Sequence, residues 1–211
     1  MHIYAFGSVC RGDVSINSDI DLLAITDGHD SRFDPNHYSI YSYKRIKELW
    51  QEGNPFAWHL ALESKLLFSS DQNDYLKSLG DPARYGNCVG DCEKFYALFC
   101  EARTSIVANP DSRIFDLSTI FLSVRNIASC FSLGATEHPR FSRDSATRLE
   151  AFSIKISTGA YQVLESARML CTRGHGSNIS TAEVNIAISE LDEIDRWMDN
   201  LVKGAKSHER I

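Results

Sequence analysis

Hydrophobic and polar positions along the chain follow two different patterns, and the change between them falls near residue 88. Before it, short apolar runs of strand length alternate with turn-rich polar segments. Ile46, Leu49 and Trp50 lie at helical spacing, and Gly53 is placed to end that helix. The expected strands are 2–6, 19–25, 37–43 and 65–68, and the expected helices are 44–53 and a segment from 54 that ends in the last strand. This part of the chain is predicted to be α/β.

After residue 88 the strand signals stop, and apolar residues recur at helical spacing. The last helix should begin at Ser180 or Thr181, with Glu183 close to a capping-box position. The expected helices are 92–108, 114–134 (ended by Gly134), 149–174 and 180–205. Four helices with apolar faces predict a bundle. The chain is therefore α+β, with a small sheet domain at 1–80 and a helical domain at 88–205.

Composition narrows the function classes. The 211 residues carry a net charge of −6 and no block of Lys and Arg, which disfavours long nucleic acid as a partner. No apolar run approaches the roughly 18 residues of a membrane span, and the N-terminus lacks a signal-peptide pattern. Six scattered cysteines favour reduced thiols, so we expect a cytoplasmic protein that does not bind a membrane. Cys88 and Cys92 form a close pair, but without a second pair or a nearby His they are expected to be ordinary cysteines rather than zinc ligands.

Two aspartates at the start of an apolar strand are the first chemical signal. Asp19 and Asp21 are two residues apart, so in a strand both side chains share one face. Two like charges so close repel each other, unless a divalent cation lies between them. Carboxylate oxygens are hard ligands that suit Mg²⁺, which often binds one or two carboxylates plus substrate phosphates. The alternative is a solvated strand start.

A Gly-Ser turn directly after the first strand is the second signal. Gly7 allows close approach of the backbone, and Ser8 adds a hydroxyl for a phosphate. Arg11 could neutralise phosphate charge. Each feature alone is common. Their order, from strand to Gly-Ser, Arg-Gly, polar loop, Ser-Asp-x-Asp-Leu and apolar strand, is much more specific.

The stretch GSVCRGDVSINSDIDLL resembles the signature of the DNA polymerase β-like nucleotidyltransferase superfamily, in its minimal-nucleotidyltransferase branch. The resemblance covers about residues 1–70, and 63–68 is similar to the strand that closes the minimal domain. It implies a small mixed sheet with helices on one side. It also implies transfer of a nucleoside monophosphate from a nucleoside triphosphate to an acceptor hydroxyl, with Mg²⁺ (or Mn²⁺) as cofactor and ATP as the expected nucleotide. The later helices resemble the substrate domain of aminoglycoside nucleotidyltransferases in arrangement only.

The resemblance assigns roles to residues of this chain. Asp19 and Asp21 would bind the metals and support catalysis. The nucleotide-binding residues would be Gly7, Ser8, Arg11 and Ser18.

A third carboxylate, usual in the family, is missing from the strand at 37–43, where Ser39 stands near the expected position. Two interpretations stay open. In the first, Glu63 or Glu48 supplies the third ligand or base, although Glu48 is expected to lie on a helix in contact with solvent. Otherwise the carboxylate is absent, and the domain binds nucleotide with weak or no transfer.

Other residues have ordinary and functional interpretations. His59 lies among aromatics and is either a core histidine or a general base. Arg125 interrupts an apolar helix and needs a partner, which would be an intramolecular carboxylate, a substrate phosphate or an acidic substrate. The loops 139–145 and 172–178 are expected to be solvated, although either could meet an acceptor or a phosphate.

The leading hypothesis is a Mg²⁺-dependent nucleotidyltransferase whose helical domain presents a small molecule, a protein or an RNA end as acceptor. A homodimer of this chain is compatible with the hypothesis. The alternative is a catalytically weak or inactive nucleotide-binding regulatory module of the antitoxin kind.

Overall fold

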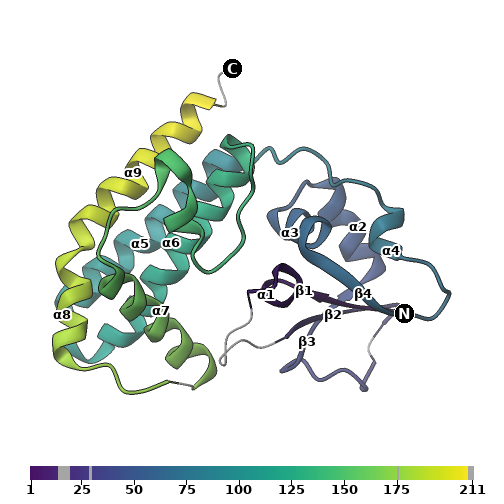
Figure 1. Cartoon of the computed structure of the whole chain (residues 1–211), viewed down its shortest axis with the longest axis horizontal. Helices are drawn as coiled ribbons and strands as arrows, with labels where there is room; N and C mark the ends of the chain where they lie inside the picture. The colour runs from purple at the N-terminus through teal and green to yellow at the C-terminus, as the bar shows by residue number, and fades with distance from the viewer. Residues whose placement is uncertain (14–19, 29, 175, 209–211) are drawn as a thin grey trace. The chain divides into compact units, whose positions relative to one another are not determined.

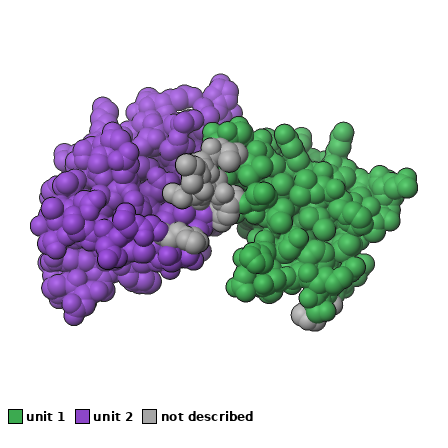
Figure 2. Space-filling model, turned by 60° about the horizontal axis from the view of Figure 1, so that its bottom comes forward, with its two compact units in different colours: residues 1–86 green, residues 87–211 purple. Residues whose placement is uncertain are grey.

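The chain folds into two compact units, Met1–Gly86 and Asn87–Ile211 (Figure 2). The computed structural model describes residues 1–13, 20–28, 30–174 and 176–208. The two units are described separately below.

The first unit is built on a mixed sheet whose order, within the described residues, is β3-β2-β1-β4. Strand β1 pairs antiparallel with β2 and β4, whereas β2 and β3 run parallel. The elements of this unit are β1 (His2–Phe6), α1 (Ser8–Arg11), β2 (Asp21–Thr26), β3 (Tyr38–Ser42), α2 (Tyr43–Gln51), α3 (Pro55–Glu63), β4 (Ser64–Ser69) and α4 (Tyr75–Ser78). The predicted strands are present, and the short helix α4 occupies a segment that the sequence marked only as turn-rich.

One face of the sheet forms the core of this unit. Helices α2, α3 and α4 cover that face (Figure 1). Alternate residues of β1 and β2 point into it because side chains in a strand alternate between faces. The buried cluster consists of Tyr4, Phe6, Leu23, Ile25, Ile46, Leu49, Trp50, Ala57, Leu60 and Leu76. This packing fixes the positions of the ends of β1 and β2 in the sheet. It therefore also positions the turn that follows β1.

The second unit is helical, which confirms the predicted α+β fold class. Helix α6 contacts α5, α7 and α9, and α8 packs on α7. The main helices are α5 (Cys88–Ala108), α6 (Arg113–Ala135), α7 (Thr158–Arg173), α8 (Thr181–Ser189) and α9 (Leu191–His208). Gly134 lies inside α6 and does not end it.

Helix α6, with the turn before it, is by length and composition able to cross a membrane. The segment Pro110–Ala135 meets that criterion among the described residues, and 61% of its most apolar window is buried inside the protein. Its contacts with three neighbouring helices are those of the central helix of a bundle.

The predicted helix 149–174 is wrong in its first third. Helix α7 begins only at Thr158, where the Ser157 hydroxyl accepts a hydrogen bond from the Ala160 N–H at 3.2 Å. Upstream, Glu150–Phe152 form a 3₁₀ turn, and Glu150 has φ 54°. Ile154 is buried and donates its N–H to the Ala146 carbonyl, which holds the backbone away from helical pairing. Tertiary contacts therefore override the apolar spacing here.

The predicted helix 180–205 is two helices. Its start is correct, since Ser180 and Glu183 form a capping box. Helix α8 ends at Ser189, and the Glu190 carbonyl accepts the N–H groups of Glu193 and Ile194 at the start of α9. The apolar stripe continues across this break, so periodicity alone does not show it.

Candidate functional site

The turn after β1 has a backbone conformation that favours glycine. Gly7 has φ 74° and ψ −138°, and helix α1 begins at the next residue. The Gly7 carbonyl accepts the N–H groups of Cys10 and Arg11. The N–H groups of Ser8 and Val9 precede these donors, so the geometry of a helix start leaves them without an acceptor inside α1. The turn therefore presents backbone donors close to the end of β1.

The Asp21 carboxylate lies directly against this turn. Asp21 is the first residue of β2 and pairs with Phe6, the last residue of β1. A Cβ atom placed on Gly7 would lie 2.8 Å from Asp21 Oδ2, so a side chain at this position would displace the carboxylate. Gly7 and Asp21, which are far apart in the sequence, are thus brought together by the register of β1 and β2.

The other predicted residues of this stretch lie outside the described residues. These residues are Ser18 and Asp19, which belong to the segment 14–19. Their assignment stays a prediction.

Glu63 takes part in a charged cluster beside the turn. Arg11 Nη1 donates to Glu63 Oε2, and Arg11 Nε donates to Asp13 Oδ2 at 3.0 Å. His59 Nε2 lies 3.0 Å from the same Glu63 oxygen, one helical turn earlier on α3. The Glu63 carbonyl accepts the Gly7 N–H at 3.1 Å. The structure therefore brings Glu63 to the predicted phosphate-binding turn, paired with Arg11 and His59.

The electrostatics of this cluster favour an ionised Glu63. Burial alone would raise the pKa of this carboxyl group. The hydrogen bond and charge of His59, followed by the charge and hydrogen bond of Arg11, outweigh burial and lower the pKa below its usual value. His59 itself packs edge-on against Phe6, with the ring centroids 5.7 Å apart.

The lowered pKa makes a prediction about pH and stability. A carboxyl group whose pKa is lower in the folded state stabilises the fold above its unfolded pKa of about 4.3, and this contribution is lost as the pH falls through the folded pKa. We expect the free energy of unfolding of wild type to exceed that of Glu63→Gln at pH 6, with the difference shrinking below about pH 4. Urea unfolding at several pH values measures this. A difference that is constant from pH 6 to pH 3 would contradict the assigned charge.

The position expected for a third carboxylate holds a serine. Ser39 of β3 pairs with Leu23 of β2. Leu23 is two residues after Asp21, so the two side chains point to the same face of the sheet. None of the residues of β3 is acidic. Within the part of the chain that the structure describes, no group of three or more His, Cys, Asp or Glu side chains is arranged to hold a metal ion. Glu48, the other sequence candidate, is on α2 and pairs with Arg45 at 3.1 Å.

Residues of the second unit that the sequence singled out have structural contacts. Arg125 Nη2 donates to the Phe141 carbonyl at 3.0 Å, within the segment 139–145. Cys88 donates to the Cys130 carbonyl at 3.6 Å. The pKa of Cys92 is raised, first by its hydrogen bond with Cys88 and then by burial.

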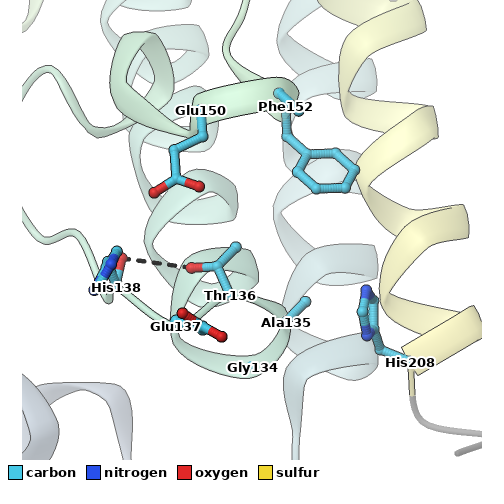
Figure 3. A pocket seen from close by; sticks show the side chains of 9 residues that line it. Gly134, Ala135, Thr136, Glu137, His138, Glu150, Phe152 and His208 are labelled. Atoms are coloured by element: carbon cyan, nitrogen blue, oxygen red, sulfur yellow. Dashed lines mark hydrogen bonds between the residues drawn. The ribbon is translucent and has the colours of Figure 1, made fainter.

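The second unit also carries an open pocket of about 430 Å³. Figure 3 shows it between the end of α6, the 3₁₀ turn at 150–152 and the end of α9. Its lining includes Glu137, His138, Glu150, Phe152 and His208. This volume falls within the range of small-molecule sites.

The first unit is similar to one known protein family. Residues 2–79 match the family model of the nucleotidyltransferase domain. This match spans the sheet and its covering helices, and includes the Gly7 turn, Asp21 and the Glu63 cluster. The second unit lies outside it. No curated protein and no solved structure matches the chain.

The first unit contains contacts that sequence reasoning missed. His59 and Glu63 are four residues apart, a spacing that places both side chains on one face of a helix and could have suggested the pair. Nothing comparable in the sequence links Arg11 to Glu63, which are 52 residues apart.

Proposed function

We propose that the chain transfers a nucleoside monophosphate from a nucleoside triphosphate, with ATP as the expected donor, to an acceptor in a reaction that depends on Mg²⁺ or Mn²⁺. A nucleotidyltransferase domain supports nucleotidyl transfer in general. The observation on which the proposal rests is the contact between the Gly7 turn and the Asp21 carboxylate. A glycine turn beside a carboxylate supports this proposal, because such a turn can accommodate phosphates and a carboxylate oxygen is a ligand that suits a hard cation.

The donor chemistry of the site fits such a cation. Asp21 supplies a carboxylate at the mouth of β2, and Asp19 is two residues earlier in the sequence. Mg²⁺ needs few protein ligands, because water and substrate phosphates complete its coordination. When bound, the ion would neutralise phosphate charge and stabilise the oxygens of the attacking and leaving groups.

The residues of this chain would act mainly by positioning. Gly7 lets the backbone approach the triphosphate without a Cβ atom in the way. Ser8 would offer its N–H and hydroxyl, and Arg11 a charged donor. Such an arrangement accelerates transfer by holding the reactants in line and by offsetting charge.

The second unit would present the acceptor. Its pocket of about 430 Å³ supports a small-molecule acceptor, since two carboxylates and an aromatic ring offer both polar and apolar contacts. A protein or an RNA end as acceptor is the other outcome of an acceptor screen.

A second candidate is a regulatory module that binds nucleotide and transfers it weakly or not at all. Two observations favour it. Strand β3 has Ser39 where a third carboxylate is expected, and Glu63 is already paired with Arg11 and His59.

The two candidates are separated by one experiment. The protein is incubated with Mg²⁺ and each labelled nucleoside triphosphate, with a panel of acceptors, and wild type is compared with Asp19→Ala/Asp21→Ala. The enzyme hypothesis expects pyrophosphate release and acceptor labelling that disappear in the double variant. Nucleotide binding without labelling of any acceptor supports the regulatory module. Release that persists in the double variant contradicts the metal assignment.

A further inference from the structure

Glu63 contacts the predicted phosphate site twice. Its main-chain carbonyl accepts the Gly7 N–H at 3.1 Å, and its side chain pairs with Arg11. One residue at the end of α3 therefore links the two elements expected to meet the triphosphate.

The guanidinium group of Arg11 is held on two of its three nitrogens. Nε donates to Asp13 and Nη1 to Glu63, whereas no described residue accepts a hydrogen bond from Nη2. The Arg11 side chain is only 21% exposed, and that of Glu63 only 13%. A planar group fixed in this way keeps one donor edge in a defined direction.

Glu63 is itself held from the other side. His59 Nε2 lies 3.0 Å from Glu63 Oε2, and the imidazole packs against Phe6 and Phe56. Phe6 is buried in the core of the first unit. The orientation of the carboxylate is thus tied to the packing of α3 on β1.

We propose that Glu63 is a positioning residue, which acts through Arg11 so that Nη2 meets a phosphate of the nucleotide at the Gly7 turn. This inference rests on the proposed function and adds a role for a residue that the sequence suggested as a metal ligand or base. An arginine side chain loses rotamer entropy when it is ordered, and this loss is a free-energy cost. Here Glu63 and Asp13 order it before nucleotide binds, so binding does not bear that cost.

The test is a double-mutant cycle with MgATP as the probe. Glu63→Gln keeps the shape of the side chain and removes its charge, and Arg11→Met removes the guanidinium group. We expect Glu63→Gln to raise KM for MgATP about tenfold with kcat changed less than about twofold, as for the misplacement of one charge-assisted hydrogen bond. In the Arg11→Met background the same substitution should have no further effect on KM.

A matched control lies elsewhere in the same unit. Arg45 of α2 pairs with Glu52, the residue that follows this helix, with Nη1 and Oε1 3.1 Å apart and both side chains exposed. Glu52→Gln removes an ion pair of the same chemistry and should leave KM within about twofold. The apparent Mg²⁺ requirement should also be the same in Glu63→Gln as in wild type.

Three results would overturn the role of Glu63. The substitution could raise KM equally in the Arg11→Met background, could change only thermal stability, or could shift the Mg²⁺ requirement as loss of a metal ligand would. If no turnover is found, the same cycle is measured as MgATP affinity by calorimetry. Wild type that neither binds nor turns over MgATP contradicts the proposed function, whereas wild type that binds it with independent effects of Arg11 and Glu63 contradicts this inference alone.

Discussion

Asp21→Asn is expected to lower nucleotidyl transfer by about 10³-fold, because it removes the charge of the one residue of the predicted aspartate pair that the structure describes. The amide keeps the size of the carboxylate, so the contact with Gly7 and the pairing of β1 with β2 should persist. Thermal unfolding should therefore change little. Rates of pyrophosphate release at saturating MgATP measure the loss.

The control for this prediction lies directly after the same strand. Asp27 follows the other end of β2 and is exposed, so Asp27→Asn removes the same charge at a distance from the turn. It should leave the rate within about twofold. Equal rates for Asp21→Asn and wild type would contradict a role of Asp21 in transfer. A large loss of rate in Asp27→Asn would show a general effect of net charge.

Gly7→Ala is the second substitution with a large expected effect. With φ 74° and ψ −138°, an alanine at this position should cost about 1–3 kcal/mol of folding free energy. Its Cβ atom would also lie 2.8 Å from Asp21 Oδ2, which forces the carboxylate to move. Displacement of a catalytic group by about 1 Å can lower a rate about 10²-fold. Chemical denaturation and the transfer rate measure the two effects.

Gly12 offers a matched comparison at the end of α1. Its φ is 81°, but a Cβ atom there would meet nothing within 4 Å. Gly12→Ala should therefore lower stability by about 1 kcal/mol and leave the transfer rate nearly unchanged. If Gly12→Ala and Gly7→Ala reduce the rate equally, the contact between Gly7 and Asp21 is not what positions the carboxylate.

The first unit could be predicted well from sequence because its signals are local. The strands of the sheet begin and end within a few residues of the apolar runs, and turn residues separate them. In the second unit the same reasoning failed at two junctions. The segment before Thr158 and the break at Glu190 both have helical apolar spacing. In the first, the Ile154 N–H pairs with the Ala146 carbonyl, and at the second the Glu190 carbonyl accepts the first N–H groups of a new helix.

The third carboxylate shows a different limit. The absence of an acidic residue from 37–43 is visible in the sequence, but its meaning depends on which strand lies beside β2. The parallel pairing of β2 with β3 puts Ser39 at that place and supplies no substitute from the same strand.

The sequence by itself determined the order of strand, Gly-Ser turn, aspartates and apolar strand, because each of these depends on residues close together in the chain. Only the tertiary structure decided that Asp21 lies against Gly7 and that Glu63 holds Arg11 and contacts His59. Arg11 and Glu63 meet because β4 pairs with β1 and α3 packs on the sheet, which returns the end of α3 to the turn. Such a contact depends on strand register and helix packing between residues that are 52 positions apart, and no local pattern encodes it.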